Sequence, residues 1–270
     1  MIRYFEKDNK MSSGFVAGTL VHTDKGLVPI QNLKVGDLVL SKNEFDGTKS
    51  FKPVENIFRY EQEEIFVLRF IDNFIEPDEN DFFTPVMNLP NQKPSKIHLE
   101  FSAPNQKIWV NENKEQEISQ GWRSVIKMTG REQFYFKDNE ELGGVISVNN
   151  LCRTHIQDVF YFDSNGDYLP FVIDLRNQKI IIYYVAHLVL DAYHNQFNAE
   201  QHLPMAENIV IGDLDKHHVL NEIMNLIKNP SCDNFAKKEI YSLEIAENNN
   251  YFVGNLGILV GDSTIQGTIE

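Results

Sequence analysis

Short apolar stretches separated by turn residues fill the chain from Gly14 to about Ile71, which is typical of consecutive β-strands. "GTLVHT" and "GLVPI" are separated by "DKG", a hairpin signal. "VGDLVLS" continues in the same style, and residues 51–70 alternate apolar and polar side chains over two strands. The amino-terminal part is therefore predicted to be a β-sheet structure.

The strand pattern returns after an acidic, proline-rich stretch at residues 72–94, which is expected to form a loop. Residues 96–110 and 122–136 have strand character. Further on, Asn165–Gly166 lies between two aromatic runs, the strongest short hairpin signal in the chain.

The periodicity changes near residue 183. Residues 183–202 and 213–229 place apolar side chains at helical spacing, so two helices are predicted there. Asp213 or Asp215 would cap the second helix at its amino terminus.

The last part of the chain, residues 239–263, returns to strands with turns at "ENNN" and "GNLG". The predicted fold class is therefore mainly β, with a mostly helical insertion before the last strands. Residues 1–150 would form the first part of the β domain, 151–238 the insertion or accessory lobe, and 239–270 the strands that complete the domain.

Composition narrows the function classes. The chain has 270 residues, of which 42% are hydrophobic and 24% charged, as in an ordinary globular protein. It has no apolar run long enough for a transmembrane helix, and its charged first residues lack the apolar core of a signal peptide, so a cytoplasmic location is expected. The formal net charge of -14 disfavours binding to nucleic acid and favours a basic protein partner.

The chain has two cysteines, Cys152 and Cys232. Two are too few for a disulfide scaffold or a cysteine-rich zinc site, so two free thiols are expected. No cofactor-binding motif is found in the sequence.

Three segments resemble the blocks of the Hint superfamily, the hedgehog and intein domains. "GFVAGTLVHTDKGLVPIQNLKVGDLVLS" is similar to the first block in nearly every position after its first residue. "EFSAPNQKIWV", followed by "GWRSV", resembles the middle block, and "YSLEIAENNNYFVGNLGILVGDS" resembles the last two blocks. The closest likeness is to the Hint modules of bacterial polymorphic toxins. The resemblance implies a horseshoe-like all-β domain that brings the first and last blocks together.

The resemblance also implies a chemistry, which is acyl transfer. In the family, an amino-terminal Cys or Ser attacks the preceding carbonyl, and a Thr and a His in the middle block polarise that peptide bond. A final His-Asn pair then cleaves the chain by cyclisation of the Asn side chain. These groups act as nucleophile, carbonyl polariser and proton shuttle.

This sequence departs from the family at every one of those positions. Glycine replaces the nucleophile, the middle Thr and His are Ala and Gln, a later His is Asn, and the final His-Asn is Gly-Asp. The positions are Gly14, Ala103, Gln106, Asn249, Gly261 and Asp262. An ionised aspartate is a poor route to a cyclic imide at neutral pH. No catalytic residue is therefore expected, although Ser263 stands where inteins keep a downstream nucleophile, and Ser102 lies beside the Thr position.

A calcium loop is a weak alternative for one segment. Asp163, Asn165, Asp167 and Asp174 occupy positions 1, 3, 5 and 12 of such a loop. However, Tyr168 stands where the loop needs glycine, so a plain hairpin is favoured.

The histidines give no convincing metal site. His187, Asp191 and His194 would share one helical face, but they lack a fourth ligand and are interpreted as a polar stripe, with zinc as the alternative. The adjacent His217 and His218 would diverge by about 100° on a helix.

Three further side chains receive structural interpretations. His22 is interpreted as a strand residue that flanks the family's active cleft, and Trp109 and Trp122 as core or rim aromatics. The insertion lacks the acidic helix motif of homing endonucleases and is itself acidic, so it is interpreted as a binding lobe.

Two functional hypotheses follow. In the first, the chain is a catalytically inactive Hint-like domain that acts as a protein-interaction module, linked to a bacterial toxin system as immunity protein, adaptor or decoy. Its partner would be a basic toxin or toxin-associated protein. In the second, it is an autoprocessing (splicing or self-cleaving) domain, residually active or trapped by mutation. A free Met start and the short tail after Asp262 favour the first, since processing domains usually carry cargo.

Overall fold

The computed structural model describes most of the β-rich parts of the chain. The described residues are 2–4, 13–72, 97–114, 116–138, 142–153, 157–164, 167–176, 181–184 and 235–262. The predicted acidic loop at 72–94 lies outside them except for Asp72.

Within the described residues, nineteen strands form two sheets. The strands of the large sheet are β1 (Ile2–Tyr4), β2 (Phe15–Val16), β3 (Leu20–Thr23), β4 (Gly26–Pro29), β5 (Leu38–Lys42), β6 (Lys49–Glu64), β7 (Phe66–Ile71), β8 (Ile97–Ser102), β9 (Lys107–Val110), β10 (Gly121–Ser124), β11 (Gln133–Tyr135), β12 (Leu142–Asn150), β17 (Lys237–Ile245), β18 (Asn250–Val253) and β19 (Ile258–Gly261). A smaller sheet, called here the accessory sheet, consists of β13 (Cys152–Arg153), β14 (Val159–Ser164), β15 (Asp167–Asp174) and β16 (Ile181–Tyr184). The mainly β class predicted from the sequence is confirmed.

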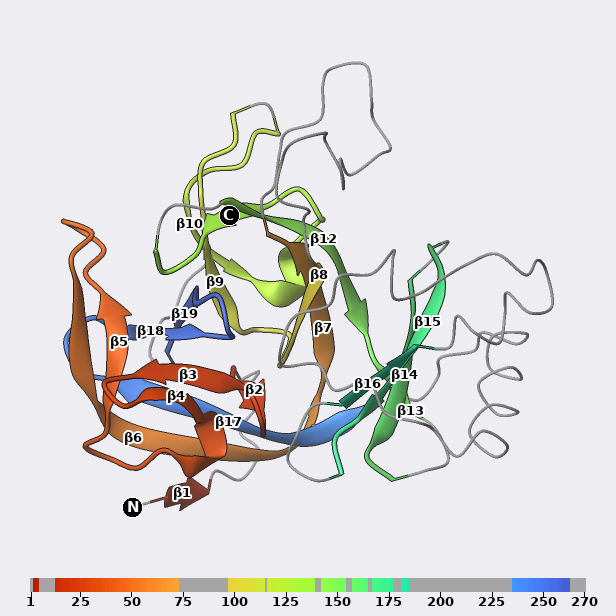
Figure 1. Ribbon diagram of the computed structural model, residues 1–270, viewed down its shortest axis with the longest axis horizontal. Helices are drawn as coiled ribbons and strands as arrows, with labels where there is room; N and C mark the ends of the chain where they lie inside the picture. The colour runs from red at the N-terminus through yellow and green to blue at the C-terminus, as the bar shows by residue number, and fades with distance from the viewer. Residues whose placement is uncertain are drawn as a thin grey trace.

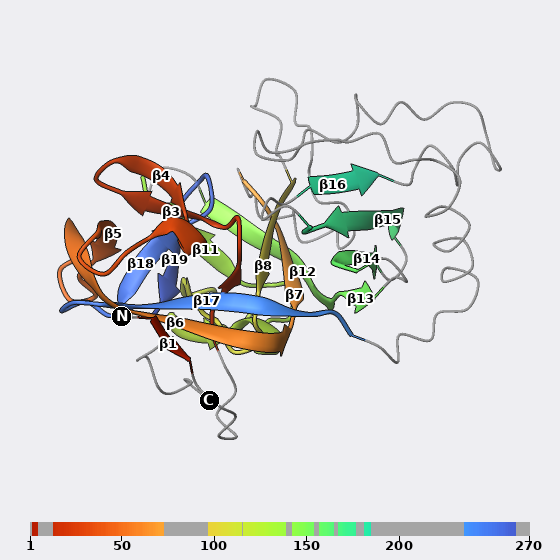
Figure 2. The same ribbon diagram turned by 90° about the horizontal axis from the view of Figure 1, so that it is seen from below.

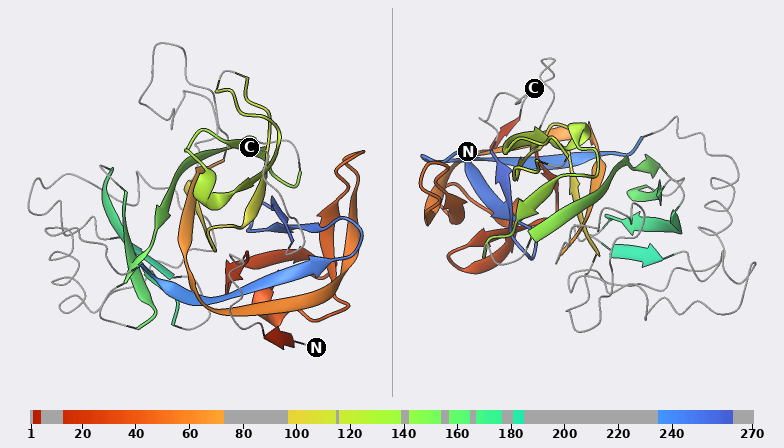
Figure 3. Two further views of the ribbon diagram at one scale, coloured as in Figure 1. Left: turned by 180° about the vertical axis from the view of Figure 1, so that it is seen from behind. Right: turned by 90° about the horizontal axis from the view of Figure 1, so that it is seen from above.

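The two ends of the chain meet in the large sheet. Its strand order is β10-β9-β19-β18-β3-β5-β6-β17-β2-β8-β7-β12-β11, with β1 paired to β6 and β4 to β3. Strands from the first 64 residues therefore alternate with strands from the last 34. Figures 1 and 3 show the longest contact of this kind, in which β17 runs alongside β6 as an antiparallel partner.

Several turns confirm the strand pattern in the sequence. β3 and β4 form the predicted hairpin, with Thr23 opposite Gly26. β14 and β15 form the hairpin predicted from the aromatic runs, with Ser164 opposite Asp167. β18 and β19 pair across the "GNLG" turn, with Val253 opposite Ile258.

Strand β7 departs from the predicted alternation of apolar and polar side chains, because all six of its residues are buried. Phe66 and Leu68 belong to one apolar cluster, and Val67 belongs to a second cluster on the opposite face. A strand covered on both faces has no solvent side, so it carries a continuous apolar run.

The second cluster joins the accessory sheet to the large sheet. Phe160 and Ile173 from the accessory sheet pack in it with Val67 and Phe101 from β7 and β8. Figure 2 shows the accessory sheet at one end of the large sheet. Burial of such side chains contributes about 1.5–3 kcal/mol each, which makes this contact a substantial part of the core.

The helical insertion is corrected where the structure describes it. Tyr183 and Tyr184, the expected first residues of a helix, instead end β16, which pairs with β15. A short apolar run fits both periodicities, and the β-branched and aromatic residues of "IIYY" favour the strand. The rest of both predicted helices lies outside the described residues. Within those residues the helical segments are two 3-10 turns, η1 (Ile30–Asn32) and η2 (Val125–Lys127).

The expectation of two free thiols is wrong for Cys152, which is disulfide-bonded. Cys232 lies outside the described residues. Disulfides persist in oxidising compartments, so this bond does not favour the cytoplasmic location expected from the sequence. In the described part of the chain, no helix is long and apolar enough to cross a membrane.

One fully buried side chain, Asn250, ties β18 to β5. Its Oδ1 accepts hydrogen bonds from Ser41 Oγ (3.0 Å) and the Lys42 amide (2.9 Å). Its Nδ2 donates to the carbonyls of Lys42 (2.8 Å) and Asn248 (2.9 Å). Three of these four hydrogen bonds hold the carboxy-terminal hairpin against β5, and the fourth fixes the turn before β18.

We expect Asn250→Ala to lower the free energy of unfolding by about 2–4 kcal/mol, because it leaves several buried groups without partners. Urea unfolding followed by fluorescence measures this change. Asn32→Ala, at an exposed position of η1, is the control and should stay within about 0.5 kcal/mol of the parent. An equal effect of both substitutions would contradict the proposed role of Asn250.

Candidate functional site

The three blocks identified in the sequence converge on the two-residue strand β2. Phe15 lies opposite Tyr241 of β17 on one side and opposite Ser102 of β8 on the other. The Ala103 amide donates to the Gly14 carbonyl at 2.9 Å. The structure therefore places Gly14 directly beside Ala103.

Gly14 occupies a backbone geometry that excludes a side chain. Its φ is +143°, which L-residues rarely adopt. A Cβ at Gly14 would lie 2.5 Å from the Tyr241 carbonyl oxygen and 3.3 Å from Ile240 Cδ1. The close approach of β17 to Gly14 thus depends on the absence of a side chain there.

Gln106 links the middle block to the last block. The side chain is fully buried, and its Nε2 donates to the Gly261 carbonyl at 2.8 Å and to the Lys107 carbonyl at 3.0 Å. The Gln106 amide nitrogen in turn donates to the Ala103 carbonyl at 3.1 Å. A carboxamide does not ionise at neutral pH, so Gln106 can bind a carbonyl here but cannot serve as a general acid or base.

The terminal Gly261-Asp262 pair is also held by structural contacts. Asp262 is 2% exposed, and its Oδ2 accepts a hydrogen bond from the Ile245 amide at 2.8 Å. The Asp262 amide donates to the Asn249 carbonyl at 2.8 Å. Burial, and secondarily the negative charge of Asp262, raises the pKa of the Tyr251 hydroxyl above its usual range.

Asn249 contributes to this site through its backbone, since its side chain is exposed and its φ is +56°. A left-handed conformation is one that asparagine tolerates, and it shapes the turn between β17 and β18. Ser263 lies outside the described residues.

Ser102 and His22 are two further buried polar side chains among the described residues. Ser102 is 1% exposed, and its hydroxyl has no hydrogen-bond partner within the described residues. His22 Nε2 lies 2.7 Å from the Gly254 carbonyl. Burial lowers the pKa of this imidazole, so the neutral ring donates to the carbonyl. His22 thereby holds the β18–β19 turn, in keeping with its interpretation as a flanking strand residue.

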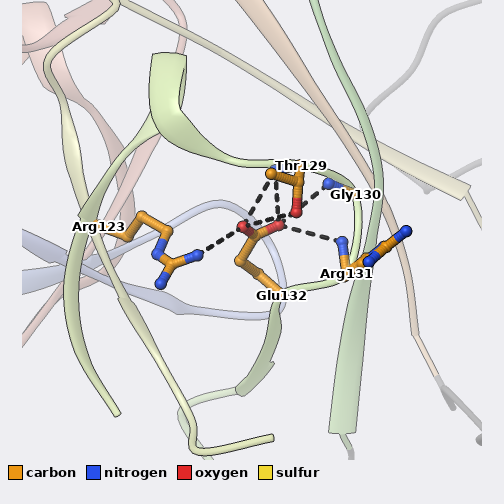
Figure 4. A network of polar contacts seen from close by, with 5 residues as sticks. All are labelled: Arg123, Thr129, Gly130, Arg131 and Glu132. Carbon is orange, nitrogen blue, oxygen red and sulfur yellow. Dashed lines mark hydrogen bonds and ion pairs between the residues drawn. The ribbon is translucent and has the colours of Figure 1, made fainter. Parts of the chain in front are cut away.

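A buried carboxylate that the sequence analysis missed fixes the segment after the middle block. Glu132 is fully buried and accepts hydrogen bonds from the amides of Thr129, Gly130 and Arg131 at 3.0–3.1 Å. Arg123 Nη1 lies 3.0 Å from its Oε1. Figure 4 shows these donors surrounding the carboxylate. The short "TGRE" turn, which aims consecutive amides at its own glutamate, is the signal that could have indicated it.

This network supports the site through η2. The Val125 amide donates to the Gln106 carbonyl and the Ile126 amide to the Pro104 carbonyl, both at 2.9 Å. The turn around Glu132 therefore anchors the element that holds the middle block in place.

The candidate calcium positions fall partly within the described residues. Asp163, Asp167 and Asp174 lie in the paired strands β14 and β15, the hairpin favoured from the sequence. Within the described residues no group of three His, Cys, Asp or Glu could hold a metal ion. The remaining candidates lie outside those residues: Asn165, His187, Asp191, His194, His217 and His218.

The two tryptophans are partly buried rim aromatics. Trp109 and Trp122 face each other across β9 and β10, with ring centroids 5.1 Å apart in an edge-to-face arrangement. Trp122 Nε1 donates to Glu44 Oε1 at 3.1 Å, which ties this pair to the turn between β5 and β6.

No protein-family model matches the chain, and no curated protein matches it. Among solved structures, it is similar to a bacterial intein-like domain from Clostridium thermocellum, with 13% identity, coverage of 92% of this chain and 97% of that chain, and a TM-score of 0.45. It is also similar to a DnaB intein from Synechocystis sp. PCC 6803, with 8% identity, coverage of 93% and 99%, and a TM-score of 0.45. A DnaX mini intein from Spirulina platensis has 11% identity, coverage of 93% and 99%, and a TM-score of 0.41.

We expect Gly14→Cys to destabilise the protein without producing self-cleavage, because the new Cβ would press against the Tyr241 carbonyl. The cost should exceed about 1–3 kcal/mol, the usual cost of backbone strain alone. Urea unfolding and intact mass measure the two effects.

Gly26→Ala is the matched control, since Gly26 has a φ of +96° but no atom within 4 Å of the place that a Cβ would take. This variant measures the destabilisation caused by a side chain at positive φ without a steric clash between its Cβ and a neighbouring atom. A Gly14→Cys variant as stable as Gly26→Ala would contradict the steric argument.

Proposed function

We propose that this chain is a catalytically inactive Hint-like domain that acts as a protein-interaction module. The observation that carries the proposal is the contact chain Gly14–Ala103–Gln106–Gly261–Asp262. These positions correspond to the catalytic set of the family that the sequence resembles. Each is committed to holding strands together, and none carries a thiol, hydroxyl or imidazole.

The alternative, an autoprocessing domain, would need a nucleophile and a group to relay its proton. Ser102 is the candidate nucleophile within the described residues, and it lies on β8 opposite Phe15 and Phe66. The imidazole of His22 is already hydrogen-bonded to the Gly254 carbonyl. This arrangement favours the inactive domain over the autoprocessing domain.

The interaction role is supported by exposed apolar side chains in the amino-terminal hairpins. They are Leu27, Val35, Leu38, Phe45 and Phe51, and Phe45 is completely exposed at the turn between β5 and β6. Leu38 and Phe51 alternate along their strands with the buried Val39 and the half-buried Lys52, so both face solvent. Clusters of exposed apolar residues are typical of protein-binding surfaces.

The turn that carries Phe45 is well fixed. The Phe45 amide donates to Asn43 Oδ1 at 2.8 Å, and the Asn43 amide donates to the Thr48 carbonyl at 2.8 Å. The Thr48 amide donates to Asp46 Oδ1 at 2.8 Å. A rigid turn presents an aromatic anchor to a partner at a small entropic cost.

The nature of the partner is proposed from charge and resemblance. A net charge of -14 favours a basic protein. The likeness of the first block to Hint modules of polymorphic toxins suggests a toxin or toxin-associated protein, which this chain would bind as immunity protein, adaptor or decoy.

We expect the intact mass of the purified chain to stay constant over days at neutral pH, with and without added thiol. Mass spectrometry at intervals checks this. Loss of the residues after Asp262, or cleavage before Gly14, would contradict inactivity and support autoprocessing. If cleavage occurs, a Ser102→Ala variant tests whether Ser102 is the nucleophile. Cleavage that persists in this variant excludes Ser102.

We expect the double variant Phe45→Ser, Phe51→Ser to lose at least about 90% of partner capture, since buried aromatic anchors dominate binding energy. The assay is affinity capture from the source cells, with bound proteins identified by mass spectrometry. Ile126→Ser removes an apolar side chain of the same 46% exposure as Phe51 and should capture like the parent. Equal capture by all three proteins would contradict this surface.

A further inference from the structure

A small cavity lies between β8 and the turn that joins β18 to β19. Its volume is about 10 Å³, room for about one water molecule, and its lining includes Phe70, His98, Glu100, Gly254 and Leu256. Glu100 is 7% exposed and lines the cavity, with its Oε1 beside Gly254. A carboxyl group in such a place is costly to ionise.

Glu132, directly before β11, is also a buried glutamate, but its surroundings differ from those of Glu100. Glu132 is surrounded by backbone amides and Arg123, which stabilise its negative charge. The side-chain carboxyl of Glu100 has no hydrogen bond or ion pair with the described part of the chain. A buried charge without partners is unfavourable, so the neutral form of Glu100 fits this cavity and the anion does not.

Glu100 packs directly against a glycine of the turn. Gly254 has a φ of +74°, and a Cβ there would collide with Glu100 Oε1. On its other side, the Gly254 carbonyl accepts from His22 Nε2 at 2.7 Å, and its amide donates to the Leu20 carbonyl at 2.8 Å. Gly254 is therefore held between β3 and the Glu100 carboxyl.

We propose that Glu100 and Gly254 form a proton-dependent latch that keeps the β18–β19 turn closed on β8 while Glu100 is protonated. Ionisation of Glu100 draws water into the cavity, because the carboxylate needs hydrogen-bond donors that the closed turn does not supply. The turn then moves away from β8, and the Gly254 amide loses its hydrogen bond to the Leu20 carbonyl of β3. Since β19 continues to Gly261, whose carbonyl is bound by Gln106, opening of the turn also loosens the candidate site.

Among the described residues, no cation forms an ion pair with the Glu100 carboxyl. His98, on the same face of β8, stacks on Phe70 and lies 3.4 Å from Asp72 Oδ2. His22 faces the far side of Gly254, and Lys137 packs on Gly257 in the same turn. None of these groups is an ion-pair partner of Glu100.

The direction of the pH dependence follows from burial. Burial raises the pKa of Glu100 from an ordinary 4.5 to about 8. Because the pKa of Glu100 is raised in the closed state, its contribution to the stability of that state is fully present at pH values below the ordinary pKa of 4.5. The stabilisation is lost as the pH rises through the folded-state pKa. The latch is therefore strongest below about pH 4.5, weakens progressively as the pH rises toward about 8, and weakens no further above that value.

Hydrogen exchange at the Gly254 amide of the full-length chain tests the latch, with protection factors corrected for the intrinsic pH dependence of exchange. Between about pH 6 and about pH 10, we expect the parent to lose protection by at least ~10-fold, because each unit of pKa difference is a factor of ten in the opening equilibrium. Glu100→Gln, which is neutral at every pH, should keep its protection within about twofold.

Glu132→Gln is the matched control, because it also neutralises a buried glutamate. It should lower protection at both pH values and keep the pH-dependent loss of the parent. An equal loss in Glu100→Gln and the parent, or no loss in the parent, would overturn the latch.

A second measurement on the parent needs no variant. The side-chain carboxyl of Glu100 and the amide of Gly254 are followed by NMR in one titration. Both should change with a common midpoint near the pKa of about 8. A Gly254 amide that does not follow Glu100, or a Glu100 midpoint near 4.5, would overturn the proposal.

Discussion

The insertion of strand β2 between β17 and β8 is the constraint on which the rest of the structure depends. Phe15 pairs with Tyr241 on one side and with Ser102 on the other, so three distant segments are fixed by one short strand. The approach is close because Gly14 has no side chain to meet the Tyr241 carbonyl. The first, middle and last parts of the chain can therefore share one core.

Buried polar side chains provide the second level of organisation. Asn250 and Gln106 are both fully buried, and both bind backbone carbonyls of another strand. Each such contact contributes about 0.5–1.5 kcal/mol, but removal of one partner costs more because the other remains buried. A different pairing of these strands would leave buried polar groups without partners, so these contacts favour the observed strand order.

The two buried glutamates illustrate how much the surroundings decide. Glu132 is enclosed by three backbone amides and Arg123, an arrangement that suits a carboxylate. Glu100 lines a small cavity formed mostly by apolar residues, beside a glycine, and has no ion-pair partner among the described residues, an arrangement that suits the protonated acid. The same residue type thus serves as a fixed anchor in one place and as a proton-binding group in the other.

The sequence by itself determined the strands, the hairpins and the chemical groups missing from the candidate site. Turn residues and alternation are local signals, which explains the correct hairpins at Thr23–Gly26 and at residues 164–167. Residue identity alone showed that Gly14 has no nucleophile. Only the tertiary structure decided that β7 is covered on both faces and that Tyr183 belongs to a strand. It also decided which glutamate carries a stabilised charge. These features depend on contacts between residues far apart in the chain, and such contacts leave no periodic pattern within any single segment.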